Sequence, residues 1–174
     1  MTIKGYIASS ADGYIASIDG SVDFLTPYQQ IDCGYEQFIQ GIDIVVMGRK
    51  TYEVICELGD EWPYPQQQGV IVSSNPNLAL VHPSLSVWDQ DLFQLVEHLK
   101  QKQDQNVWIV GGTQLQNFFL ENNLLDVLEV YEMPVMLGDG ISLFPKRDCQ
   151  TYALKSLHAE MIAHTVIKKT YHFK

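Results

Sequence analysis

Basic residues are scarce over much of this 174-residue chain. Between Lys4 and Lys100 the only two are the adjacent Arg49 and Lys50, whereas the same stretch holds 13 Asp and Glu residues. In the whole chain, 11 Lys and Arg residues stand against 21 Asp and Glu residues, which gives a net charge of −10. A negative field of this size repels the phosphates of nucleic acids and of anionic membranes, so we expect neither as a partner.

Cysteine and long apolar runs are also rare. Cys33, Cys56 and Cys149 are far apart and form no C-x-x-C pair, and the five histidines show no metal-ligand spacing, so no metal site is expected. Reduced, mostly buried thiols in a cytoplasmic protein are the simple expectation. No run approaches the roughly 18 apolar residues of a membrane span, and the first residues lack a signal-peptide apolar stretch.

The bulk composition is that of one globular domain. Hydrophobic residues make up 46% of the chain and charged residues 18%, which is typical of a folded protein. A chain of this length can bury a substantial core without disulfides or metals. We find no repeat, low-complexity segment or linker, and therefore expect a single domain over residues 1–174.

Short apolar runs alternate with amphipathic segments. Strands are expected at positions 3–9, 44–47, 70–72, 85–88, 107–110 and 125–133. Helices are expected at about 33–41, 51–58, 92–99 and 113–122. A glycine-containing loop at 134–144 and an antiparallel hairpin at about 152–173 complete the chain. This alternation predicts an α/β fold with a largely parallel sheet and an antiparallel C-terminal edge.

Three of the expected strands end in residues suited to binding phosphate. The apolar residues are followed by small, hydroxyl-bearing or basic ones in 47–49 (Met-Gly-Arg), 72–74 (Val-Ser-Ser) and 110–113 (Val-Gly-Gly-Thr). Ligands bind at this end of parallel strands, and two of the three junctions open a helix, whose free N–H groups attract anions. The pattern predicts a nucleotide with several phosphates. The alternative is that Arg49 and Lys50 merely keep an exposed loop soluble.

These motifs resemble the dihydrofolate reductase superfamily. The likeness rests on positions 47–53, 72–74 and 108–113. Positions 10–16 and 134–144 are similar to the branch typified by the C-terminal reductase domain of the bifunctional riboflavin-biosynthesis deaminase-reductase (RibD), here as a stand-alone chain. The resemblance covers about residues 3–171. It implies a three-layer α/β/α fold with a mixed, mostly parallel sheet, and NADPH as hydride donor.

The resemblance also implies which residues hold the cofactor. Arg49 would bind the adenosine 2′-phosphate with Ser74 beside it, and Lys50 and Thr51 would bind the pyrophosphate. Backbone groups of the first strand and of the following loop would hold the nicotinamide, and the Gly111–Gly112 peptide bond would be cis. The full implied set is Ala8, Ser9, Ile15, Ala16, Gly48, Arg49, Lys50, Thr51, Ser73, Ser74, Val110, Gly111, Gly112, Thr113 and Gln114.

The predicted substrate-binding group is a carboxylate. Folate reductases grip the pterin ring with one acidic residue on the helix before the Met-Gly-Arg strand, and Asp32, 15 residues before Met47, has the required spacing. Glu36, one turn on, is the weaker candidate. Asp32 also stands where the helix should begin, and Asp is a preferred N-cap, so the capping and catalytic interpretations both stay open. Asp12 is expected only to form a turn. The loop of Trp62, Pro63 and Tyr64 either rims the pocket or packs on the surface.

The leading hypothesis is an NADPH-dependent reductase of a pteridine-like or aminopyrimidine substrate. The resemblance favours the 5-amino-6-(5-phosphoribosylamino)uracil reductase reaction of riboflavin biosynthesis. The loop at 134–144 departs from true folate reductases, which makes dihydrofolate reductase activity the alternative. A non-catalytic NADPH-binding module is a second alternative. The resemblance and the apolar C-terminal strands, whose edge invites pairing, also predict a homodimer.

Overall fold

The computed structural model describes residues 1–59, 61–144 and 153–173, so Cys149 and Tyr152 lie outside the described residues. The helices are η1 (Asp23–Tyr28, a 3-10 helix), α1 (Tyr35–Gln40), α2 (Arg49–Leu58), α3 (Leu92–Lys100) and α4 (Thr113–Glu121). The strands are β1 (Thr2–Ser10), β2 (Tyr14–Ala16), β3 (Ile44–Gly48), β4 (Gln68–Val72), β5 (Leu85–Trp88), β6 (Asn106–Gly111), β7 (Val127–Met133), β8 (Ile141–Ser142), β9 (Ser156–Ile162) and β10 (Val166–His172).

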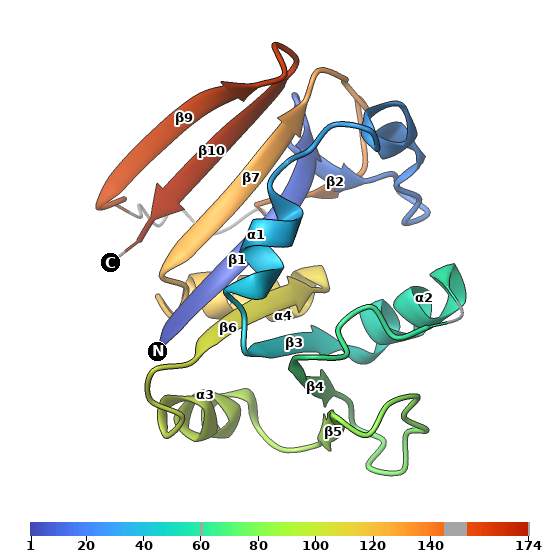
Figure 1. Cartoon of the computed structure of the whole chain (residues 1–174), viewed down its shortest axis with the longest axis vertical. Helices are drawn as coiled ribbons and strands as arrows, with labels where there is room; N and C mark the ends of the chain where they lie inside the picture. Colours follow the sequence, from blue (N-terminus) through green and yellow to red (C-terminus); the bar gives the residue numbers. More distant parts are fainter. Residues whose placement is uncertain (60, 145–152, 174) are drawn as a thin grey trace.

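Within the described part of the chain, eight strands form one central sheet in the order β5-β4-β3-β6-β1-β7-β10-β9. Neighbouring strands from β5 to β7 pair in parallel, and the β9–β10 hairpin adds to β7 in antiparallel fashion at one edge (Figure 1). These pairings confirm the predicted mixed, mostly parallel sheet. The segment expected to be a loop contains β8, which pairs with β2 in a separate two-stranded sheet.

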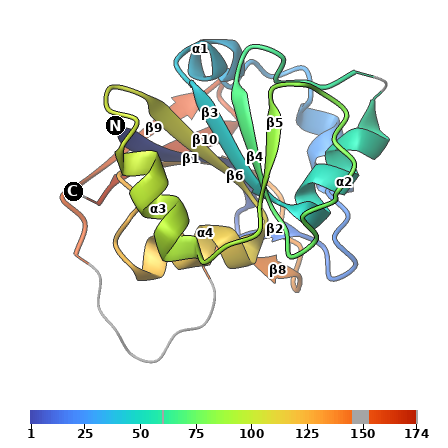
Figure 2. The ribbon, with the colours of Figure 1, turned by 90° about the horizontal axis from the view of Figure 1, so that it is seen from below.

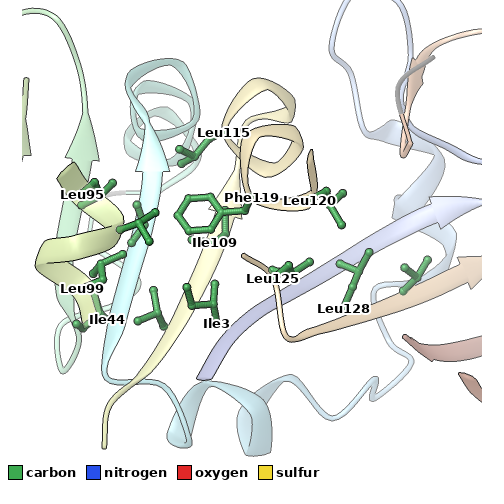
Figure 3. Close-up of a cluster of buried hydrophobic side chains, with 14 of the residues drawn as sticks. Ile3, Ile44, Leu95, Leu99, Ile109, Leu115, Phe119, Leu120, Leu125 and Leu128 are labelled. Carbon is green, nitrogen blue, oxygen red and sulfur yellow. The ribbon is translucent and has the colours of Figure 1, made fainter. Parts of the chain in front are cut away.

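Helices cover both faces of the central sheet, which makes the three layers that the resemblance implied (Figure 2). On one face, α3 and α4 pack through a buried apolar cluster that includes Leu95, Leu99 and Phe119 against Ile44 and Ile109 of the strands (Figure 3). On the other face, α1 and α2 pack on a second cluster. Continuously apolar strands such as β3 arise because both sheet faces are buried.

Two helices begin at residues other than those expected. Helix α2 starts at Arg49 rather than at Thr51, so both basic residues belong to its first turn. Helix α1 starts at Tyr35, and its N-cap is Gly34, so the interpretation of Asp32 as the N-cap is wrong. Instead, Oδ1 of Asp32 accepts a hydrogen bond from the N–H of Gly34 at 2.8 Å. Asp favours such a turn two residues ahead of the N–H that it binds.

The structure also shows how deeply two aromatic residues and two cysteines are buried. Trp62 and Tyr64 are only 8% and 7% exposed and belong to the core cluster beneath α1 and α2, so neither packs on the surface. Trp62 and Pro63 also line a small cavity of about 90 Å³. Cys33 and Cys56 are free thiols that are half-buried, not mostly buried as expected. They line the edges of two apolar clusters instead of filling them.

Candidate functional site

A cavity of about 500 Å³ lies where β3 and β4 end and where α2 and α4 begin. It brings together many residues of the predicted cofactor set, although they come from three separate stretches of sequence. Those lining it are Gly48, Arg49, Lys50, Thr51, Ser73, Ser74, Gly112, Thr113 and Gln114. The parallel pairing of β4, β3 and β6 explains this meeting, because it places the carboxyl ends of all three strands at one edge of the sheet.

The N-terminus of α2 forms one wall of the cavity. Its N-cap, Gly48, has an extended backbone and offers no side-chain cap, and the first turn that follows contains no acidic residue. The N–H groups of this turn are therefore open to a ligand, and the helix dipole adds roughly +0.5 of a unit charge there. Arg49 and Lys50, both exposed, supply full positive charges at the same place. This wall is suited to a phosphate group.

The N-terminus of α4 forms a second wall of the same kind. Its N-cap is Gly112, again without a side-chain cap and without an acidic residue in the first turn. The Gly111–Gly112 peptide bond is cis, as predicted. Gly111 has φ 145°, a conformation that favours glycine, and a Cβ on Gly112 would lie 3.3 Å from Oγ1 of Thr51. The first turn of α2 thus lies close to the turn that opens α4, and two helix N-termini without side-chain caps share one cavity.

The end of β4 supplies hydroxyl groups. Ser73 is 7% exposed, and its hydroxyl accepts a hydrogen bond from the N–H of Asn75 at 3.1 Å, which holds the turn after the strand. Ser74 is exposed and lines the cavity alongside Arg49. Ser73 therefore shapes the turn, and both serines border the cavity.

The other predicted cofactor residues flank the cavity rather than line it. Val110 and Gly111 end β6 directly before the α4 turn. Ala8 and Ser9 lie near the end of β1, the strand beside β6. Ile15 and Ala16 lie on β2, and Ala16 pairs with Ile141 of β8, which does line the cavity. Their predicted contacts with a nicotinamide remain predictions.

Asp12 does more than form the expected turn. Its carboxylate accepts hydrogen bonds from the Ser10 hydroxyl at 2.6 Å and from the N–H groups of Leu137 and Gly138 at 3.1 and 2.7 Å. The Ser10 hydroxyl and then these backbone donors lower the pKa of Asp12 below its ordinary value. Asp12 therefore fastens the segment between β1 and β2 to the segment between β7 and β8.

Asp32 and Glu36 are both exposed, and neither lines the cavity. The chain before α1 instead packs over β1 and β7, where Tyr6 donates a hydrogen bond to the carbonyl of Cys33 at 3.3 Å. The ring of Tyr6 lies 4.6 Å from that of Tyr131. Burial is the main cause that raises the pKa of both tyrosines well above the usual value. Both phenols therefore stay neutral at physiological pH, and the substrate-binding role of Asp32 stays a prediction.

Sequence reasoning missed the apolar part of the lining. Leu92, Leu115 and Ile141 complete the cavity together with Val72. Each belongs to an element that also builds the core or the small sheet, so its residue type carries no separate signal.

Among the described residues, no cluster of His, Cys, Asp and Glu could hold a metal ion. In the same residues, no helix combines the length and apolarity needed to span a membrane.

The three-layer fold defines a dihydrofolate reductase-like domain, and its paired helix N-termini border a cavity suited to anions. The chain belongs to the RibD C-terminal domain family, whose model matches residues 2–168. It is 35% identical over 140 residues to YwjB of Bacillus subtilis (strain 168), a protein of uncharacterized function, and the match covers 80% of each chain.

Solved structures agree with this assignment. A candidate riboflavin biosynthesis protein from Shewanella sp. PV-4 superposes with a TM-score of 0.85 at 25% identity, over 100% of this chain and 99% of that one. The deaminase/5-amino-6-(5-phosphoribosylamino)uracil reductase from Thermotoga maritima gives 0.73 at 14% identity, and this chain spans 56% of it. Dihydrofolate reductase from Enterococcus faecalis, complexed with NADP(H), gives 0.63 at 16% identity over 98% and 95% of the two chains.

Proposed function

We propose that this protein is an NADPH-dependent reductase of an aminopyrimidine or pteridine-like heterocycle. The observation that carries the proposal is the cavity in which two uncapped helix N-termini meet beside the Arg49–Lys50 pair. A dinucleotide with a pyrophosphate and a 2′-phosphate fits such a donor set, since each phosphate finds backbone N–H groups or a cation. Bound NADPH would supply the hydride.

Different residues of the cavity would bind different parts of the cofactor. Arg49 and Ser74 would bind the 2′-phosphate, because a guanidinium presents a fork of N–H donors to phosphate oxygens. Lys50, Thr51 and the N–H groups that open α4 would bind the pyrophosphate. The small sheet of β2 and β8 would border the nicotinamide.

Membership of the RibD C-terminal domain family supports the riboflavin-pathway reaction, the reduction of 5-amino-6-(5-phosphoribosylamino)uracil, over the reduction of dihydrofolate. A specific observation favours the non-catalytic alternative: the two candidate acids, Asp32 and Glu36, are exposed and lie outside the cavity lining. Hydride transfer to a ring often needs a proton donor or a polarising group. The proposal therefore needs a test of turnover as well as of binding.

The first test measures cofactor binding to the wild-type protein and to Arg49→Ala. A charge-assisted hydrogen bond contributes about 1.5–3 kcal/mol, and Arg49 is about half exposed, so NADPH should bind roughly tenfold and at most a hundredfold more weakly to the variant. NADH affinity should hardly change. Equal weakening of both cofactors would contradict the 2′-phosphate assignment.

The second test measures turnover. Oxidation of NADPH is followed by its absorbance with ribosylated aminopyrimidines, pterins and dihydrofolate as substrates. We expect oxidation with an aminopyrimidine. Tight binding of NADPH with no oxidation across this panel would favour the non-catalytic module.

A further inference from the structure

Arg49 is bound to another residue of its own helix. Its Nη1 donates a hydrogen bond to Oε1 of Glu53 at 2.6 Å, one turn further along α2. The two side chains are 46% and 44% exposed, so both remain in contact with solvent. Arg49 lines the cavity, whereas Glu53 does not. Arg49 therefore pairs with a carboxylate of the protein and also borders the cavity where a ligand phosphate would bind.

We propose that Glu53 sets the ratio of NADPH to NADH affinity by competing with the cofactor 2′-phosphate for Arg49. This inference rests on the proposed function. Glu53 follows the first turn of α2, so its charge does not cancel the open N–H groups that would bind the pyrophosphate. Its influence falls on Arg49, the residue that would distinguish a 2′-phosphate from a 2′-hydroxyl.

Two opposite effects of Glu53 have to be compared. By holding the guanidinium in place, the carboxylate saves some of the entropy that Arg49 would lose on binding a phosphate. A helical pair at i,i+4 is worth only about a factor of two in equilibrium. A phosphate with a charge near −2 that shares the guanidinium would lie about 6 Å from the carboxylate. The Coulomb repulsion at that distance in water amounts to roughly a factor of ten without salt and roughly a factor of three at physiological salt. The repulsion between Glu53 and the 2′-phosphate therefore outweighs the benefit of holding Arg49 in place.

The last turn of α2 offers a matched control. Glu57 is exposed and lies four residues beyond Glu53, about 6 Å further from Arg49 along the helix axis. Replacing Glu57 by Gln removes the same charge from the same helix without touching the Arg49 pair. A general effect of net charge on the binding of an anionic cofactor would appear in both Glu53→Gln and Glu57→Gln. Competition for Arg49 would appear only in Glu53→Gln.

The experiment measures dissociation constants of NADPH and NADH for wild type, Glu53→Gln, Glu57→Gln, Arg49→Ala and the Arg49→Ala/Glu53→Gln double variant, at low and high salt. Glu53→Gln should bind NADPH about three- to tenfold more tightly and NADH within twofold of wild type. The gain should shrink at high salt. The gain in NADPH affinity from Glu53→Gln should fall below twofold in the Arg49→Ala background, because no guanidinium then holds the 2′-phosphate close to Glu53. Glu57→Gln should bind both cofactors as wild type does.

The outcomes separate this inference from the proposed function. Wild type that binds NADPH, with Glu53→Gln unchanged or weaker, would overturn the competition and leave the function standing. An equal gain in Glu57→Gln, or an undiminished gain without Arg49, would also overturn it, since a general field would explain the data. Failure of wild type to bind NADPH would overturn both.

Discussion

Replacing Gly140 by Ala should disturb the small sheet beside the cavity. A Cβ at this position would lie 2.3 Å from the carbonyl oxygen of Ala16 and 3.4 Å from its carbonyl carbon. The obstacle is backbone, so no side-chain rotation can relieve it. Ala16 pairs with Ile141, the residue after Gly140, and Ile141 lines the cavity. Strands β2 and β8 would therefore have to separate by about 1 Å, and Ile141 would move with them.

Overpacking of this kind costs about 1–3 kcal/mol. For a chain of this length each kcal/mol lowers the melting temperature by about 2–4 °C, so the variant should melt roughly 2–12 °C lower. Its NADPH affinity should also fall, since one wall of the cavity is displaced. Thermal unfolding and cofactor titration measure the two effects.

Gly59→Ala is the matched control, because a Cβ there meets nothing within 4 Å and the residue has an extended backbone. It should leave both the melting temperature and the affinity close to the wild-type values. A Gly140→Ala protein with wild-type melting temperature and wild-type NADPH affinity would refute the reasoning, because the contact would then cost nothing.

Two further predictions concern stability and assembly. The pKa of Asp12 is lowered by the donors that it binds, so its stabilisation is complete above its ordinary pKa of 3.8 and is lost as the pH falls through the lowered value. Urea unfolding should therefore show a gap in stability between wild type and Asp12→Asn at pH 7 that narrows as the pH is lowered below 3.8; a gap independent of pH would contradict this. Strand β9 forms the sheet edge, with Leu157 and Met161 56% and 59% exposed, and we propose that it pairs in a homodimer. Light scattering should give about twice the 19.8 kDa chain mass, and a monomer at micromolar concentration would disprove the dimer.

The sequence predicted the parts of this protein that depend on local patterns. Continuous apolar runs identified the central strands, and glycine or basic residues directly after them identified the helix starts that line the cavity. Arg49 and Lys50 were identified as candidate phosphate-binding residues because they are isolated in an acidic stretch. A pair of adjacent glycines marked the turn before α4. In each case the signal lies within a few residues of the feature that it predicts.

The parts that were missed depend on contacts between distant residues. Strand β8 has two residues and exists because β2, far away in sequence, pairs with it. The hydrogen bonds that Asp12 accepts from the N–H groups of residues 137–138 have the same origin. Asp32 was misjudged as a helix cap because an Asp before an apolar helix pattern fits both a cap and a turn, and only the backbone of Gly34 decides between them.

The position of β6 has a consequence for how the chain can be made. Strand β6 separates β1 from β3 in the sheet, although both of these strands come well before it in the sequence, β1 by more than half the chain. A nascent chain that ends before Asn106 therefore has a gap in the middle of its sheet, and neither Ile3 nor Ile44 can meet its neighbour on β6. Because β6 leads through Gly111 directly into the turn that opens α4, the step that closes the sheet also completes the cavity. We expect chains truncated before this strand to stay unfolded and prone to aggregation, so that stable fold and binding site arise together during synthesis.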